Sequence, residues 1–306
     1  MANLSKFQKE TEIPNAIKRY LEDVGTNQTQ LGRDAKVGEA YMSHILQGKT
    51  HIGKTAIKDK YYLALCNAIG YEVKVEIWRH FNTNNFKTII NELKKARRNK
   101  TRLVIDADTG AGKTYACKMY KQKYPVGTFV VKCSAIENSK EFAINIAEVV
   151  GVETHGTAGK IIKRVAKKLL SLDDAILIID EGEHIGKKSG YINIIKSAAD
   201  LLEEVVPFVI LGMGINEILR KGFERNKQNF RQTARRFSKR ETCEQSIAED
   251  VVKICEELNL SKTVQNWFAN RMRNFDEFKV LVVEAITEAK KLSQPVTVRL
   301  LNELYS

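Results

Sequence analysis

The chain has 306 residues, 43% of them apolar, which is enough for two domains with separate hydrophobic cores. Its five cysteines form no C-x-x-C pair, no apolar run has transmembrane length and the N-terminus lacks a signal-peptide core. These absences argue against a zinc site, a disulfide framework and a membrane partner, and we expect a cytoplasmic protein. The formal net charge of +13 predicts a polyanionic partner, most often nucleic acid.

Residues 1–75 have the pattern of a small all-α domain. The stretch NAIKRYLEDVG places Ile17 and Leu21 on one face of a helix. In the stretch that follows, NQTQLGRDAKVGEAYMSHILQGKT, Gly38 separates two apolar runs with helical spacing, and Gly48 ends the second run. These features are similar to those of the lambda-repressor-like helix-turn-helix domains.

The resemblance to helix-turn-helix domains implies particular contacts with DNA. Gln28 opens the first motif helix and would bind a backbone phosphate. The other expected DNA contacts belong to the second motif helix and its end: Glu39, Ala40 and Ser43 toward base edges, and His44, Gln47 and Lys49 toward phosphate. An acid such as Glu39 suits DNA only where it accepts a hydrogen bond from cytosine. The alternative for this domain is a helical unit that binds protein.

A linker and a leading helix are predicted for residues 76–100. The polar sequence NTNN indicates a loop and the start of a helix. The helix ends in the charge run KKARRNK, which is typical of a solvated helix face. In a chain that binds DNA, such a face can also contact phosphate.

A phosphate-binding loop is predicted in DADTGAGKTY, residues 106–115. The loop lies between an apolar strand, RLVID, and a helical run, KTYACKMYKQKY, which is the context that makes the pattern meaningful. Backbone N–H groups and the helix N-terminus would hold the phosphates of ATP, and Lys113 would reach the β- and γ-phosphates. Ala107 stands where the usual pattern has glycine. The residues expected to contact ATP are Thr109, Gly110, Ala111, Gly112, Lys113, Thr114 and Tyr115.

A second buried strand ends in two acids. The stretch AILIIDEGEH, residues 175–184, has a continuous apolar run followed by Asp180 and Glu181. We expect Asp180 to bind Mg²⁺ together with the Thr114 hydroxyl, and Glu181 to polarise the attacking water. The alternative is a strand that ends in a solvated acidic turn. The pair of acids favours ATP hydrolysis over nucleotide binding alone.

A third apolar strand and a basic run follow. The strand PFVILGMG, residues 207–214, is followed by Asn216, our candidate sensor of the γ-phosphate. The run RKGFERNKQNFRQTARRFSKR, residues 220–240, has nine Lys or Arg and one Glu. Together with the loop and the acidic strand end, these features resemble the AAA+ ATPases over residues 86–306.

The AAA+ resemblance implies a three-layer α/β/α core with a parallel sheet, residues 101–246, and a helical lid, residues 247–306. It places the arginine that completes a neighbouring subunit's ATP site on Arg236, with Arg235 as the second choice. The alternative is that both arginines extend a DNA-binding surface. Asp276 stands where the family's lid often has an arginine, so Arg271 or Arg273 would substitute for it.

The order of a repressor-like domain, an AAA+ module and a short lid resembles the Mu B family of phage transposition proteins. That resemblance implies an ATP-dependent homo-oligomer, filament or ring, on double-stranded DNA, which delivers the DNA to a DDE transposase that stimulates ATP hydrolysis. Residues expected on the DNA face of the core are Lys160, Lys163, Arg164, Lys187 and Lys188. Two alternatives remain open: a replication helicase loader or initiator-type ATPase, and an operator-binding transcription regulator that is switched by nucleotide.

Overall fold

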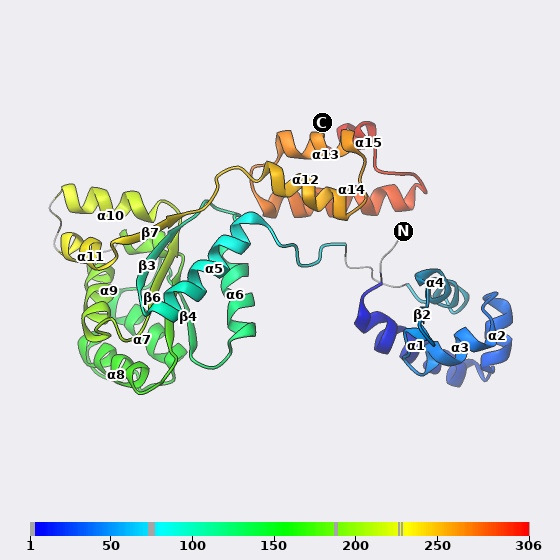
Figure 1. Cartoon of the computed structure of the whole chain (residues 1–306), viewed down its shortest axis with the longest axis horizontal. Helices are drawn as coiled ribbons and strands as arrows, with labels where there is room; N and C mark the ends of the chain where they lie inside the picture. The colour runs from blue at the N-terminus through cyan, green and yellow to red at the C-terminus, as the bar shows by residue number, and fades with distance from the viewer. Residues whose placement is uncertain (1–3, 73–76, 187–188, 226, 228, 306) are drawn as a thin grey trace. The chain divides into compact units, whose positions relative to one another are not determined.

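The computed structural model describes residues 4–72, 77–186, 189–225, 227 and 229–305. The chain divides into two units, residues 1–79 and residues 80–306 (Figure 1). Within the described ranges, no helix has both the length and the apolar character that crossing a membrane requires.

The first unit is a small helical body with a short hairpin. Its elements are η1 (Gln8–Glu12), α1 (Ile13–Val24), α2 (Gln28–Asp34), α3 (Glu39–Leu46), β1 (His51–Ile52), β2 (Thr55–Ala56) and α4 (Asp59–Ala68). Fully buried side chains such as Ile17, Ile45 and Leu65 pack α1, α3 and α4 into one core. The hairpin departs from the all-α domain that we predicted. It forms because Gly53 adopts φ +57°, a turn conformation that glycine favours.

The second unit contains a parallel sheet and the helices that cover it. Its elements up to the lid are α5 (Asn84–Asn99), β3 (Arg102–Asp106), α6 (Lys113–Lys123), β4 (Thr128–Lys132), α7 (Ser139–Val150), α8 (Ala158–Leu170), β5 (Ile176–Asp180), η2 (Gly182–Gly186), α9 (Ser189–Leu201), β6 (Phe208–Gly212), α10 (Ile215–Glu224), α11 (Phe230–Arg236) and β7 (Lys239–Thr242). The strand order is β4-β5-β6-β3-β7, and every pair is parallel. The carboxyl ends of the strands therefore meet at one edge, which is where open α/β sheets bind their ligands.

The central strands are apolar along their whole length because both faces of the sheet are covered. On β5, Ile176 and Ile178 pack into the layer of α5 and α6, whereas Leu177 and Ile179 pack into the layer of α7, α8 and α9 (Figure 1). The predicted three-layer α/β/α core with a parallel sheet is confirmed.

The lid follows the sheet and consists of α12 (Ala248–Glu257), α13 (Lys262–Arg271), α14 (Phe275–Lys291) and α15 (Val298–Tyr305). Phe268 and Phe278 are fully buried and stack edge to face with their ring centroids 5.4 Å apart. Two hydrogen bonds connect the lid to the rest of the second unit, one to the start of α5 and one to the loop between β3 and α6. The Asn84 N–H donates to Asp250 Oδ2 at 2.8 Å, and the Phe275 N–H donates to the Gly110 carbonyl at 3.0 Å.

Candidate nucleotide-binding and catalytic site

The predicted phosphate loop joins the end of β3 to the start of α6. Gly110 and Gly112 have φ values of +72° and +86°, so both lie in the left-handed region where a side chain would be strained. Ala107 is 3% exposed, its methyl group packs in the core below the loop, and its N–H donates to the Gly212 carbonyl at 3.0 Å. The loop therefore requires glycine at positions 110 and 112, and the core below it accommodates the alanine at position 107.

The Lys113 side chain is held inside the loop. Its ammonium donates to the carbonyl of Ala107 at 2.7 Å and to that of Asp108 at 2.9 Å, and the residue is only 9% exposed. Lys113 is also the first residue of α6, where the helix dipole adds partial positive charge. The loop thus combines a cation and a helix N-terminus, which is the electrostatic environment that phosphate groups require.

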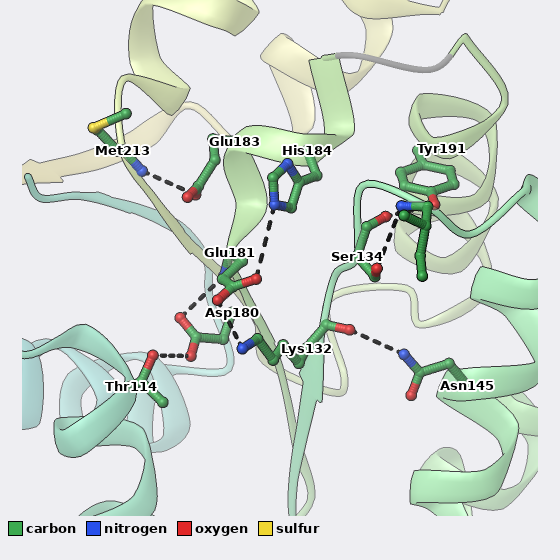
Figure 2. A network of polar contacts seen from close by, with 11 residues as sticks. Thr114, Lys132, Ser134, Asn145, Asp180, Glu181, Glu183, His184, Tyr191 and Met213 are labelled. Atoms are coloured by element: carbon green, nitrogen blue, oxygen red, sulfur yellow. Dashed lines mark hydrogen bonds and ion pairs between the residues drawn. The ribbon is translucent and has the colours of Figure 1, made fainter. Parts of the chain in front are cut away.

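Thr114 and Asp180 form the site that suits a divalent cation. Thr114 Oγ1 donates to Asp180 Oδ2 at 2.7 Å, and the Asp180 carboxylate is 2% exposed at the end of β5 (Figure 2). The Glu181 N–H donates to Asp180 Oδ1 at 3.0 Å and orients the carboxylate. A hydroxyl and a carboxylate in direct contact fit Mg²⁺, because this ion keeps several waters and takes one or two protein ligands beside the phosphates. These two side chains would hold the ion, and the charge of the ion would balance that of the triphosphate.

Glu181 pairs with Lys132 and lies near His184. Its Oε1 lies 2.9 Å from Lys132 Nζ, at the end of β4, and its Oε2 lies 3.8 Å from His184 Nε2 (Figure 2). The hydrogen bond to Glu181 raises the pKa of Lys132 above its usual value. Glu181 also has φ +56°, a conformation that costs a residue other than glycine about 1–2 kcal/mol. The ion pair with Lys132 engages Oε1, so Lys132 competes with water for this oxygen of the carboxylate.

Asn216 does not face Asp180. Its side-chain amide donates to Thr242 Oγ1 at 3.4 Å, at the end of β7, whereas β6 and β3 separate β7 from Asp180 on β5. The Asn216 N–H donates to Asp106 Oδ2 at 2.9 Å, so Asp106 caps the start of α10. The side chain that contacts the phosphate loop from the end of β6 is Met213, whose sulfur accepts from Thr109 Oγ1 at 3.1 Å. The role of Asn216 as sensor stays a prediction, and it requires the amide to turn away from Thr242.

The two candidate trans-acting arginines differ in their contacts. Arg236 pairs with Asp200 on α9, and its Nη1 donates to the Gln232 carbonyl at 3.1 Å. Arg235, by contrast, is exposed. Arg236 must therefore break an ion pair within its own subunit before it reaches a neighbour.

An aromatic cluster lies beside the start of α6. The Tyr115 hydroxyl lies 2.9 Å from His80 Nδ1, and the His80 ring stacks on Tyr115 with centroids 5.7 Å apart. Phe86 packs edge to face against His80 with centroids 4.7 Å apart. Tyr115 was among the residues expected to contact ATP, and the rings of His80 and Phe86 contact its ring.

The lid reaches the phosphate loop through Asn274 and Phe275 and not through the arginines that we expected. A Cβ on Gly110 would lie 2.5 Å from Asn274 Cβ, so glycine is also required here for close approach. Arg271 instead lies over the Trp267 ring, 4.4 Å from its centroid.

The residues predicted to contact DNA lie in both units of the chain. In the first unit, α2 begins at Gln28 and α3 begins at Glu39, and both side chains are exposed together with Ala40 and Lys49. Ser43 and His44 are half-buried, and Ser43 Oγ accepts from Gln47 Nε2 at 3.3 Å. The helix-turn-helix assignment stays a prediction.

In the second unit, Lys160 and Lys163 are exposed on α8. Arg164 is held to the preceding loop, since its Nε donates to the Glu153 carbonyl at 3.0 Å and its Nη2 donates to the carbonyl of His155. Lys187 and Lys188 lie outside the described residues.

The sequence analysis missed three residues of this site: Lys132, His184 and His80. Lys132 carried a usable signal, because it is the charged end of the apolar strand TFVVK and parallel strands present such ends at one edge. His184 follows Glu181 by three residues, a spacing that brings side chains together in a helical turn. His80 carried no comparable signal.

Comparison with known proteins agrees with this geometry. Residues 96–221 match the family model of the AAA domain. The structure is similar to the Orc1 protein of Aeropyrum pernix solved in complex with DNA, with a TM-score of 0.54 and 15% identity over 76% of this chain and 66% of the Orc1 chain. It is also similar to domain III of the replication initiation protein DnaA of Thermotoga maritima, with a TM-score of 0.50 and 16% identity over 75% of this chain and 94% of that domain.

A search of curated proteins found no match. The chain therefore contains an AAA-type P-loop ATPase domain with the fold of the initiator ATPases. It spans just under two thirds of the Orc1 chain, at 66%.

Proposed function

We propose that this chain, with its AAA-type P-loop domain, hydrolyses ATP and assembles on duplex DNA, which it delivers as target to a DDE transposase. The observation that carries the ATPase activity is the 2.7 Å hydrogen bond between Thr114 and Asp180 beside a loop bent at two glycines. Glu181, the next residue after Asp180, supplies a carboxylate whose side chain is 31% exposed and whose Oε1 becomes free for water when it leaves Lys132.

Each residue would have one part in the reaction. Lys113 would exchange its bonds to the loop carbonyls for bonds to the phosphates, so its charge remains compensated. Thr114 and Asp180 would hold Mg²⁺, which supplies charge neutralisation at the phosphates when it is bound. Glu181 would accept a proton from the attacking water. An arginine of a neighbouring subunit, Arg236 or Arg235, would stabilise the charge of the transition state.

If the arginine comes from a neighbouring subunit, ATP binding is coupled to the association of subunits. ATP then lies between two subunits and stabilises their association, and hydrolysis weakens it. Each added subunit brings further cations to the duplex, consistent with the net charge of +13. DNA affinity should therefore fall steeply with salt.

A second candidate function is that of an initiator-type ATPase or helicase loader. The fold similarity to Orc1 and to DnaA domain III favours it, since both are initiator proteins. The predicted order of a repressor-like domain before the AAA domain supports the transposition hypothesis instead. The operator-binding regulator differs from both in needing no oligomer along the duplex.

The experiment that tests the proposal is electron microscopy with duplex DNA and a slowly hydrolysed ATP analogue, combined with footprinting. Continuous, ATP-dependent protection that lengthens with protein concentration supports assembly on DNA. A single protected palindrome without ATP supports the regulator. A protein that stays monomeric and unbound with saturating Mg²⁺-ATP contradicts the proposal. Addition of a cognate transposase, with stimulation of ATP turnover as the readout, separates target delivery from helicase loading.

Three variants test the assigned residues. Lys113→Ala should lose ATP binding and ATP-dependent assembly. Glu181→Gln should bind ATP, turn it over slowly and form persistent assemblies on DNA. Arg236→Ala should bind ATP as a monomer without hydrolysing it, and mixing it with Lys113→Ala subunits should restore activity if the arginine acts in trans. Lys140→Ala, an exposed lysine on α7, is the matched control and should behave like wild type.

A further inference from the structure

The two helices on one face of the sheet are unusually cationic. α5 has five Lys or Arg residues and one acid, and α6 has four Lys residues and no acid. The single acid, Glu92, is 6% exposed and already pairs with Lys95. The two helices pack together over one core, as Figure 1 shows. The end of α5 lies near the end of α6, because Arg97 lies over the Tyr124 ring, 5.5 Å from its centroid.

A hollow of about 580 Å³ lies where the two helices end. It is lined by residues of α5, by Tyr120 of α6 and Tyr124 just after it, and by one acid, Asp174; the α5 residues are Asn91, Lys94, Lys95, Arg97 and Arg98. Arg97 has a structural role, because it donates to Asp174 Oδ1 at 2.8 Å and to Thr128 Oγ1 at 2.9 Å. Lys94 and Arg98 are exposed, and no acidic partner is recorded for either among the described residues.

Helix dipoles account for only part of this charge. The negative C-terminal ends favour Arg97 and Arg98 on α5 and Lys121 and Lys123 on α6. The effect falls off within the last turn, so it does not account for Lys94 or Lys118.

We propose that the surface formed by Lys94 and Arg98 of α5 and Lys118 and Lys121 of α6, termed here the α5–α6 face, binds the backbone phosphates of duplex DNA. The inference rests on the proposed function and names a surface for it. Along α5, Lys94 and Arg98 are about 6 Å apart at 1.5 Å per residue, a distance over which duplex DNA presents roughly three to four phosphate charges. This density of regularly spaced charge matches the face better than an acidic protein surface does.

The α5–α6 face is separate from the other surfaces already considered. Along α6, Lys118 lies about 7.5 Å and Lys121 about 12 Å beyond Lys113 of the phosphate loop, so phosphate contacts at the end of the helix do not touch the ATP site. The lysines of α8 lie in the opposite layer of the core. The face can therefore be altered without changing either of them.

The test compares two triple variants of the full chain that lose the same charge. Lys94→Gln/Arg98→Gln/Lys121→Gln alters the face, and Lys262→Gln/Lys279→Gln/Lys290→Gln alters exposed lysines of the lid. Fluorescence anisotropy measures binding to a labelled duplex with a slowly hydrolysed ATP analogue, over a range of salt concentrations. Circular dichroism and the DNA-free ATPase rate report on folding and the nucleotide site, and both should stay unchanged.

We expect the face variant to bind duplex DNA at least about ten-fold more weakly at low salt, with a salt slope smaller by about two to three. The lid variant should differ from wild type by less than about three-fold. Equal effects of the two variants, or an unchanged DNA affinity of the face variant, would overturn the α5–α6 face while the proposed function stands. A wild-type chain that binds no duplex with ATP overturns both.

Discussion

Replacing Lys132 with methionine should raise, not lower, the DNA-free ATPase rate. Methionine keeps most of the apolar stem but removes the ammonium that lies 2.9 Å from Glu181 Oε1. In the structure this ion pair holds the carboxylate that we assign as the acceptor of the water proton. Its loss increases the fraction of time for which Glu181 is available to water.

The size of the effect follows from the exposure of the pair. The Lys132 side chain is 66% exposed and that of Glu181 is 31% exposed, so solvent screens the attraction. Exposed ion pairs of this kind shift an equilibrium by about two- to five-fold. His184, 3.8 Å from the other oxygen, still restrains the carboxylate in the variant. We therefore expect the ATPase rate to rise by about two- to five-fold and no more.

The assay is steady-state phosphate release without DNA at saturating Mg²⁺-ATP, repeated over a range of salt concentrations. Because salt screens the pair, the wild-type rate should approach that of Lys132→Met as salt increases. Lys140→Met, an exposed lysine on α7, serves as the control and should match wild type. A rate that falls ten-fold or more would show that Lys132 acts on the phosphates, and an unchanged rate would show that the pair does not limit Glu181.

Three further changes test other parts of the structure. Asp200→Asn releases Arg236 from its ion pair and should raise the ATPase rate of the DNA-bound oligomer by about two- to five-fold, and a large loss would argue against Arg236 acting in trans. Gly127→Ala should destabilise the fold by about 2–4 kcal/mol in urea unfolding, since φ is +76° and the Cβ would lie 1.9 Å from the Asp174 carbonyl oxygen. Burial raises the pKa of Asp250, so its contribution to stability is present below the unfolded-state pKa and is lost as pH rises through the folded-state pKa. Asp250→Asn should therefore raise the Tm relative to wild type at pH 7, and the difference should shrink toward pH 4.

The nucleotide loop and the sheet that holds it could be predicted from local sequence patterns. Strands buried on both faces are continuous apolar runs, so β3, β5 and β6 could be recognised without knowledge of their neighbours. The loop was equally clear, because Gly110 and Gly112 occupy positions where the backbone requires glycine.

Contacts between side chains of different strands and helices could not be predicted from local sequence patterns. Lys132 ends β4 and Glu181 follows β5, its neighbour in the sheet, but the two residues are far apart in the chain. The end of the strand TFVVK indicated that Lys132 lies at the edge of the sheet, but not which acid it pairs with. Arg236 was chosen as the trans-acting arginine from its place before Phe237, yet its contact with Asp200 depends on how α11 packs against α9. The direction of the Asn216 amide likewise depends on β7, which follows it by more than twenty residues in the chain.

The sequence by itself determined the phosphate loop and the position of its lysine, because both depend on glycines and a helix start that are local in the chain. Only the tertiary structure decided which side chains restrain Glu181 and that the ends of α5 and α6 lie near each other. The physical reason is that charges act through space, and the distances between them are set by packing and not by separation along the chain.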